Sequence, residues 1–362
     1  MLSKENTTPP EKPVVPEIHS RERLNRTQAL EFLTRSPLGE LMRQGLAMRK
    51  HLHPGNEVTW VFDTNPNHTN ICHTRCSFCA FWRDEKDGYR LTTEELIQRL
   101  TPAVSQGATT VLIQGGHDPA LTLDDWVALI RAIVYAFPQI HLHPFSPPEI
   151  LFMAQQEETT VEHVLKTLWD EGIRTIPGGG AEILADSVRQ RISPAKCRAD
   201  EWLDLMESAH GMGFKTTATM MYGHIETAED IVDHLLSLRS LQERTGGFSS
   251  FIPWSFKPGT TPLGRQIRQP APAIDYPRLI ALARLVLDNI PHIQSSWFSE
   301  NMRAGQLGLL AGADDYGGLL FEENVLDQAG HAPKNDKNRI LDSIRAMGFQ
   351  PVQRDGFYRP IN

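Results

Sequence analysis

Short β-rich runs alternate with amphipathic helical windows along most of this chain of 362 residues. Strands that alternate with helices form βα units, whose strands lie in one parallel sheet, and eight such units can close into a barrel. The alternation therefore predicts an α/β fold, a TIM-type (β/α) barrel with eight strands, although six strands with an appended piece would give nearly the same pattern. The eight runs are VTWVFD, TTVLIQG, IHLHPF, GIRTIP, KTTATMMYG, FIPWSF, HIQSSWF and YGGLLF.

The two ends of the chain lack this alternation. Residues 1–20 contain prolines at positions 9, 10, 13 and 16 and little apolar surface, which predicts a flexible tail. We expect an N-terminal helical extension over residues 21–56, interrupted at Pro37, and the barrel over residues 57–325. Residues 326–362 are expected to form a C-terminal helical segment that packs on the barrel.

Composition narrows the possible partners. The chain carries 44 acidic and 36 basic residues, a net charge of −8, which argues against nucleic acid or an anionic membrane as a partner. No apolar run approaches the roughly 18 residues that a membrane helix needs. The first residues are polar and proline-rich, unlike a signal peptide, so we expect a cytoplasmic protein. In a reducing compartment, cysteines indicate metal binding or catalysis before disulfides.

Three of the four cysteines, Cys72, Cys76 and Cys79, lie within eight positions, directly after the first predicted strand. A zinc site would normally need a fourth protein ligand, for which a nearby histidine would have to serve. A redox dithiol would need Cys76 and Cys79 alone. A 4Fe-4S cluster can take three cysteines and leave one iron open for chemistry. The spacing CxxxCxxC, with Phe78 before the third cysteine, favours the cluster.

Polar and glycine-rich segments follow several predicted strands, at the barrel rim where enzymes of this fold carry their chemistry. Gln114, Gly115 and Gly116 end the second strand, and glycines let a ligand approach the backbone closely. Glu182 follows three glycines after the fourth strand and could accept a hydrogen bond from a bound hydroxyl. An ordinary turn and a carboxylate that favours the start of a helix are the respective alternatives.

The same rim offers candidate bases and aromatic surfaces. His143 and Glu149 lie at or after the third strand and His224 after the fifth, and a histidine at a strand end is a natural proton acceptor. Glu149 could equally cap the next helix, and His224 could be a structural histidine. Substrate contacts are expected from aromatic side chains near strand ends, with core packing as the alternative: Tyr222, Trp254 and Trp297.

The segment from Cys72 to Cys79 resembles the signature of the radical S-adenosylmethionine (SAM) superfamily. Further strings, reaching from the first strand to residue 325, resemble its menaquinone (futalosine-route) branch: NICHTRCSFCAFWR, IQGGHDP, SPPEI, GGGAEIL, TTATMMYGHIET, RTGGFSSFIPWSFKPGTTPL, DNIPHIQSSW and GGLLFEENV. The resemblance implies a 4Fe-4S cluster held by the three cysteines. It also implies SAM contacts from Phe78, Gln114, Gly115, Gly116 and Glu182.

The resemblance further implies a reaction. SPPEI, FIPW and IQSSW lean towards the branch's cyclase, which acts on dehypoxanthine futalosine in menaquinone biosynthesis. There the adenosyl radical takes the ribose C4′ hydrogen, the carbon radical adds to the benzoate ring, and loss of an electron and a proton restores aromaticity. The alternatives are aminofutalosine synthase and related radical SAM enzymes. A donor such as flavodoxin or ferredoxin would supply electrons, and His224, His143 or Glu149 would take the proton.

Overall fold

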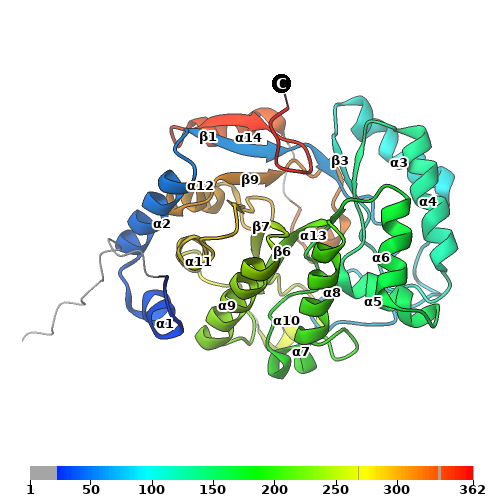
Figure 1. Ribbon diagram of the computed structural model, residues 1–362, viewed down its shortest axis with the longest axis horizontal. Helices are drawn as coiled ribbons and strands as arrows, with labels where there is room; N and C mark the ends of the chain where they lie inside the picture. Colours follow the sequence, from blue (N-terminus) through cyan, green and yellow to red (C-terminus); the bar gives the residue numbers. More distant parts are fainter. Residues whose placement is uncertain (1–22, 268, 333–335, 362) are drawn as a thin grey trace, which may run out of the picture.

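The computed structural model describes residues 23–267, 269–332 and 336–361, so the tail expected over residues 1–20 lies outside the described part. The N-terminal extension consists of α1 (Arg26–Arg35) and α2 (Leu38–Leu52). Pro37 separates the two helices as predicted, because a proline begins a helix easily but interrupts one already running. Both helices pack on the outside of the barrel, at the left in Figure 1.

Every strand pairing in the three sheets is parallel, as the alternation of strands and helices predicts. The sheets have the orders β10-β1-β9, β2-β3-β4 and β5-β6-β7-β8. The strands are β1 (Glu57–Val61), β2 (Asp63–Thr64), β3 (Thr110–Leu112), β4 (His141–His143), β5 (Thr175–Ile176), β6 (Lys215–Tyr222), β7 (Phe248–Ser255), β8 (His292–Ile293), β9 (Asp315–Gly318) and β10 (Gln350–Gln353).

Side-chain and single-bridge contacts join these sheets around the barrel. The Thr175 hydroxyl of β5 donates to Leu142 O of β4 (3.3 Å), and an isolated bridge between Gln294 and Asp315 joins β8 to β9. The parallel α/β architecture is thereby confirmed. Its described strands form three hydrogen-bonded sheets rather than one continuous ladder, so the number eight stays a prediction.

Helices follow most strands and cover the outside of the sheets (Figure 1). Their starts are encoded locally: Thr92 and Glu95 form the reciprocal capping box that the sequence predicts at α3. The helices are α3 (Thr93–Ser105), α4 (Leu123–Ala136), α5 (Pro147–Gln156), α6 (Val161–Asp170), α7 (Asp186–Ile192), α8 (Ala199–Gly211), α9 (Ala228–Thr245), α10 (Pro262–Gln266), α11 (Asp275–Val286) and α12 (Met302–Ala311). None of the described helices combines the length and the apolar character needed to cross a membrane.

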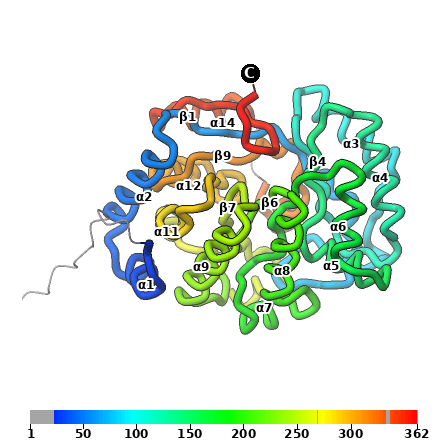
Figure 2. Tube along the Cα trace, viewed as in Figure 1, coloured from blue at the N-terminus to red at the C-terminus, as the bar shows by residue number. Residues whose placement is uncertain are grey.

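The C-terminal region is only partly helical, which corrects the prediction for residues 326–362. It contains α13 (Asn324–Gln328) and α14 (Lys337–Arg345), but Gln350–Gln353 form β10, which pairs in parallel with β1. Figure 2 shows this last stretch running beside β1. The strand is short and contains Pro351, so propensity does not reveal it. It forms because the edge of β1 presents backbone groups that need hydrogen-bond partners.

Candidate active site

Cys72, Cys76 and Cys79 lie on the loop between β2 and α3, at the C-terminal rim of the barrel. Backbone hydrogen bonds anchor this loop: Ser77 N donates to Ile192 O (2.8 Å) and Cys79 N to Cys76 O (3.1 Å). All four cysteines of the chain are free thiols. Cys76 is buried and the other two are partly buried. Three thiols are thus held within eight positions of one loop, which Ser77 N joins to the end of α7.

The three thiols suit a 4Fe-4S cluster. Burial raises the pKa of the Cys76 thiol to about 12 and also raises the pKa of Cys79. Both therefore stay protonated unless a metal stabilises the thiolate. Cys72 and Cys79 in their charged forms add to the rise in the pKa of Cys76, so the three thiols lie close enough to act on one another. A 4Fe-4S cluster takes three cysteines on separate irons and leaves one iron open.

A buried ion pair stands beside the cysteine loop, and its lysine was not predicted. Lys196 Nζ lies 2.9 Å from Glu182 Oε1 and 5.4 Å from the centre of the Phe78 ring. Burial opposes the ammonium, but the Glu182 carboxylate, together with Cys76 and Cys79 in their thiolate forms, raises the pKa of Lys196, so it stays charged. In the sequence, Lys196 is one basic residue in a loop after α7, with no motif around it.

Glu182 carries two signs of a binding role. Its Oε2 atom is buried, and no described residue gives it a hydrogen bond. Its backbone has a φ of +37°, in the left-handed region that a residue with a side chain rarely adopts. A buried acceptor without a donor indicates a ligand that would supply one. Together with Lys196, Glu182 could hold the charged and hydroxyl groups of a polar cofactor.

Gly115 and Gly116 bring the end of β3 against the cysteine loop. A Cβ atom on Gly115 would lie 2.3 Å from the His68 ring, and one on Gly116 would lie 2.0 Å from Ile71 O. No side chain fits in either place, so packing of the chain on itself already requires both glycines. Contact of these glycines with SAM therefore stays a prediction, next to a structural reason for the same residues.

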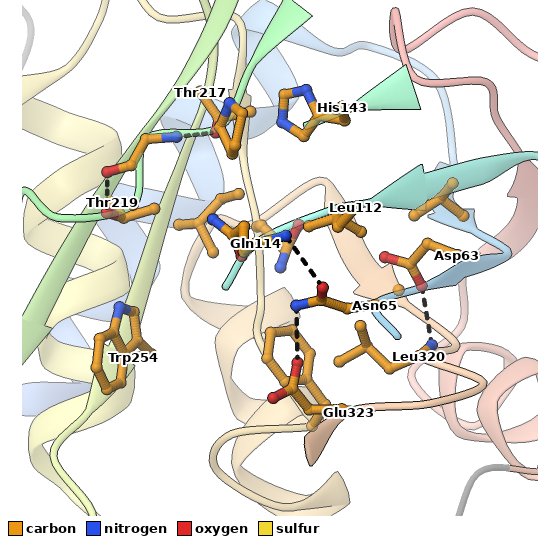
Figure 3. A pocket seen from close by; sticks show the side chains of 18 of the residues that line it. Asp63, Asn65, Leu112, Gln114, His143, Thr217, Thr219, Trp254, Leu320 and Glu323 are labelled. Atoms are coloured by element: carbon orange, nitrogen blue, oxygen red, sulfur yellow. Dashed lines mark hydrogen bonds between the residues drawn. The ribbon is translucent and has the colours of Figure 1, made fainter. Parts of the chain in front are cut away.

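A cavity of about 280 Å³ lies inside the barrel (Figure 3). Its walls are mainly apolar, with side chains such as Leu112, Ile252 and Trp254, and they carry a few buried polar groups. The C-terminal segment after β10 contributes Arg354 and Tyr358 to the lining. Tyr358 donates a hydrogen bond from its hydroxyl to Ser250 Oγ (2.5 Å), which ties this segment to β7. The cavity is thus closed in part by a region that the sequence predicted as helical.

Four of the predicted residues line this cavity: Gln114, His143, Glu182 and Trp254. His143 lies at the end of β4, and its Nδ1 is 2.8 Å from Thr175 Oγ1. Burial lowers the pKa of His143 to about 3, so the ring is neutral at physiological pH and a weak base. It can give or accept a hydrogen bond in the cavity.

The other two predicted bases lie outside the cavity lining. Glu149 accepts a hydrogen bond from Ser146 N (2.7 Å), which is the helix-capping alternative for this residue, and a second one from Gly115 N (3.1 Å) in the segment after β3. His224 Nδ1 lies 3.1 Å from Glu226 Oε2, and burial lowers the pKa of the histidine. A polar residue at the start of a helix turns towards the free backbone N–H groups there, and sequence order does not show this.

The other two aromatic candidates are also placed away from the cavity. Trp297 is buried and donates its Nε1–H to Gly318 O (3.1 Å), behind the wall that β9 forms. Tyr222 is buried, which raises the pKa of its hydroxyl. Both side chains are packed in the core, which is the alternative that the sequence left open for them.

A separate group of possible metal ligands lies at the N-terminal ends of β8 and β9. His53, His292 and Asp314 bring their ligand atoms within 4.8 Å of one another. Each is already engaged: Asp314 pairs with Arg284 and with His292 Nδ1 (2.6 Å), and His53 Nε2 lies 2.8 Å from Pro291 O. The group therefore reads as a structural network that joins α2 to the barrel.

Comparison with known proteins identifies the family. The radical SAM superfamily matches residues 66–238, and the CofH/MqnC C-terminal region matches residues 245–362. The chain is 36% identical, over 94% of its length, to cyclic dehypoxanthine futalosine synthase of Streptomyces coelicolor, of which it covers 86%. This protein belongs to the CofH/MqnC family of radical SAM enzymes. Like the other members of the superfamily, this radical SAM enzyme uses a 4Fe-4S cluster and SAM.

The relatives of this radical SAM enzyme carry two different names. It is 41% identical, over 87% of its length, to 5-amino-6-(D-ribitylamino)uracil–L-tyrosine 4-hydroxyphenyl transferase of Methanothermobacter thermautotrophicus, and it covers 88% of that protein. Among solved structures, methylornithine synthase has a TM-score of 0.72 at 17% identity, with 92% of this chain and 95% of that chain covered. That likeness confirms the fold, while the identities do not decide between the two reactions.

Proposed function

We propose that this radical SAM enzyme converts dehypoxanthine futalosine to cyclic dehypoxanthinyl futalosine in menaquinone biosynthesis. The observation that carries the proposal is the cavity, whose apolar wall around Trp254 suits a benzoyl ring and whose lining also includes the cation Arg354. One substrate with an aromatic carboxylate at one end and a sugar at the other matches such a space. The relative from Streptomyces coelicolor, which aligns over nearly the whole chain, supports the same reaction.

The cofactors are proposed to bind at the rim end of this space. Cys72, Cys76 and Cys79 would hold the cluster, and Lys196 would face the SAM carboxylate. Glu182 would accept a hydrogen bond through the Oε2 atom that has no donor among the described residues. When bound, the cluster and SAM would supply the radical chemistry that removes the C4′ hydrogen of the substrate. We expect a flavodoxin or ferredoxin as the electron donor and a cytoplasmic location.

The chain's own residues would hold the sugar and the aromatic ring of the substrate in position for the reaction. Trp254 and the aliphatic wall would exclude water from the ring, and His143, as a neutral imidazole, would hydrogen-bond a hydroxyl of the sugar. Holding the sugar carbon against the ring turns bond formation into an intramolecular step with a large entropic advantage. The Arg354 guanidinium uses three of its five N–H groups on Asp315 and Asp355 O, which leaves donors for a carboxylate.

A second candidate function follows from the archaeal relative at 41% identity, whose name describes transfer of a hydroxyphenyl group from tyrosine to a ribitylaminouracil. Aminofutalosine synthase is the third. The three reactions differ in the fate of SAM and in the number of substrates. The cyclase acts on one molecule and releases 5′-deoxyadenosine, while the aminofutalosine reaction leaves the adenosyl group in the product.

An anaerobic assay with reduced, reconstituted protein tests the proposal. Dehypoxanthine futalosine should yield 5′-deoxyadenosine and a product lighter by two hydrogens, as measured by mass spectrometry. A mixture of tyrosine and 5-amino-6-(D-ribitylamino)uracil should yield no coupled product. Product from that mixture, with none from dehypoxanthine futalosine, would replace the cyclase by the transferase. Cys76→Ala is the control, because it should abolish any reaction that depends on the cluster.

A further inference from the structure

Asp63 presents a buried carboxyl group on the cavity wall that neither the motifs nor the proposed cofactor site uses. It begins β2, at the end of the first predicted strand run, and is only 7% exposed. Leu320 N donates to Asp63 Oδ1 (2.8 Å), as Figure 3 shows. The carboxyl group also receives a hydrogen bond from its own backbone N–H. It lines the cavity, so a group that enters the cavity can reach it.

The neighbouring strand leaves room for this carboxyl group by means of a glycine. A Cβ atom on Gly318 of β9 would lie 2.2 Å from both Asp63 Oδ1 and Oδ2. No other residue could occupy position 318 without moving the carboxyl group. The Leu320 N–H therefore orients the Asp63 carboxyl group, and Gly318 leaves the space that this orientation needs. Such a supported side chain is what a positioned proton acceptor requires.

The charges that face Asp63 leave it without an ion pair. The charge of Arg354 acts on Asp63, but its guanidinium is joined to Asp315 through Nε (2.5 Å) and Nη2 (3.1 Å). Burial raises the pKa of Asp63 to about 7; the Leu320 N–H and the charge of Arg354 oppose this rise, and Asp315 adds to it. A base with a pKa near the working pH accepts protons efficiently and can also release them.

The other acids and bases of the cavity lining are engaged elsewhere. Glu182 is joined to Lys196. Glu323 Oε1 accepts hydrogen bonds from the backbone N–H groups of Val325 (2.7 Å) and Leu326 (3.3 Å) at the start of α13. His143 is a weak base, because burial holds its pKa low. Among these described groups, Asp63 differs from Glu182 in having no ion pair and from Glu323 in capping no helix, and it combines a fixed orientation with a place on the cavity wall.

We propose that Asp63 is the proton acceptor of the cyclisation and takes the proton that the benzoate ring loses after the new carbon–carbon bond has formed. The inference rests on the proposed function. The C–H bond at the attacked ring carbon breaks, the proton goes to Asp63 Oδ2, and the electron pair of that bond stays in the ring. One electron then leaves for a one-electron acceptor, an oxidised iron–sulfur or flavin protein, and the ring is aromatic again.

The test compares Asp63→Asn with Glu149→Gln in the reconstituted enzyme under anaerobic conditions. Both changes neutralise a buried carboxyl group whose pKa is raised to about 7, but Glu149 caps α5 outside the cavity lining. Asp63→Asn should still release 5′-deoxyadenosine in the presence of substrate. The amount of cyclic product formed per 5′-deoxyadenosine should fall at least tenfold, and Glu149→Gln should keep the wild-type ratio.

Two further measurements separate a chemical role from a structural one. A substrate-derived organic radical should accumulate in freeze-quenched Asp63→Asn samples, as seen by electron paramagnetic resonance. The dissociation constant of the substrate, measured without reductant by quenching of tryptophan fluorescence, should stay within twofold of wild type. Gly318→Ala, which displaces the carboxyl group without removing it, should show the same low product ratio.

The outcomes distinguish the two proposals. If wild type turns over dehypoxanthine futalosine and Asp63→Asn keeps the wild-type product ratio, the assignment of Asp63 is wrong and the cyclase function stands. An equal loss in Glu149→Gln would also overturn the assignment, because neutralising any buried carboxyl group would then suffice. If wild type leaves dehypoxanthine futalosine unchanged, the proposed function fails and the role of Asp63 fails with it.

Discussion

Replacing Asp63 with asparagine should make the protein more stable at alkaline pH and change its stability little in acid. Burial raises the pKa of Asp63 from 3.8 to about 7, so the folded state binds a proton more tightly than the unfolded state. Between these two values the free energy of unfolding of wild type falls as the pH rises. The stabilisation by the neutral carboxyl group is complete below pH 4 and lost above pH 7.

The magnitude follows from the pKa rise. At 1.36 kcal/mol per unit of pKa, a rise from 3.8 to about 7 corresponds to about 4 kcal/mol in total. Asparagine has the same shape, can still accept the Leu320 N–H and never carries a charge. Going from pH 5 to pH 8, we therefore expect Asp63→Asn to gain about 3 kcal/mol over wild type.

Urea unfolding of both proteins at pH 5, 6.5 and 8, under anaerobic conditions and with the same cluster content, measures this difference. The midpoint of Asp63→Asn should rise above that of wild type as the pH increases, with an unchanged slope of the transition. A difference that is constant across the three pH values would refute the reasoning, because Asp63 would then not titrate differently in the folded state. A gain in stability together with a loss of product is typical of a residue kept for function.

Three further predictions concern the ion pairs and the thiols. Arg354→Met leaves Asp315 buried without its cation and should lower the free energy of unfolding by about 3–5 kcal/mol, measured as a lower calorimetric midpoint. The double variant Arg354→Met/Asp315→Leu should recover most of this stability. Equal losses in the two variants would contradict a buried ion pair. Lys196→Gln should weaken SAM binding at least tenfold in equilibrium dialysis while iron content stays normal, and unchanged affinity would remove Lys196 from the site. Cys76→Ala should lose bound iron and sulfide on chemical analysis and Cys197→Ala should not, so equal iron in both would contradict a cluster at the CxxxCxxC loop.

Local patterns predicted the elements and the thiol loop well. The eight β-rich runs correspond to the strands from β1 to β9, with the first run divided into β1 and β2, and the capping box at Thr92 is present. These features depend on neighbours within a few positions, where hydrophobic period and capping chemistry act. Strand β10 was not predicted because it depends on its pairing partner: Gln350–Gln353 form a strand by hydrogen bonding to β1.

The candidate bases show where such patterns stop being informative. Glu149 and His224 follow strands, as catalytic groups of this fold do, but the first caps α5 and the second lies beside Glu226, outside the cavity lining. Conversely, Asp63 and Arg354 have no motif around them and are brought to the same cavity by β2 and by the segment after β10. They are nearly 300 positions apart in the sequence, so no local pattern indicates that both line one cavity.

Strand period, helix caps and cysteine spacing are local properties of the chain, so a parallel α/β protein with three thiols on one loop can be read from the residues alone. Which polar groups face the cavity, which cap helices or form ion pairs, and which carboxyl groups have a raised pKa became visible only in the folded molecule. Burial and pairing depend on segments that meet in space, and the pKa of a side chain such as Asp63 responds to those surroundings rather than to its neighbours in sequence.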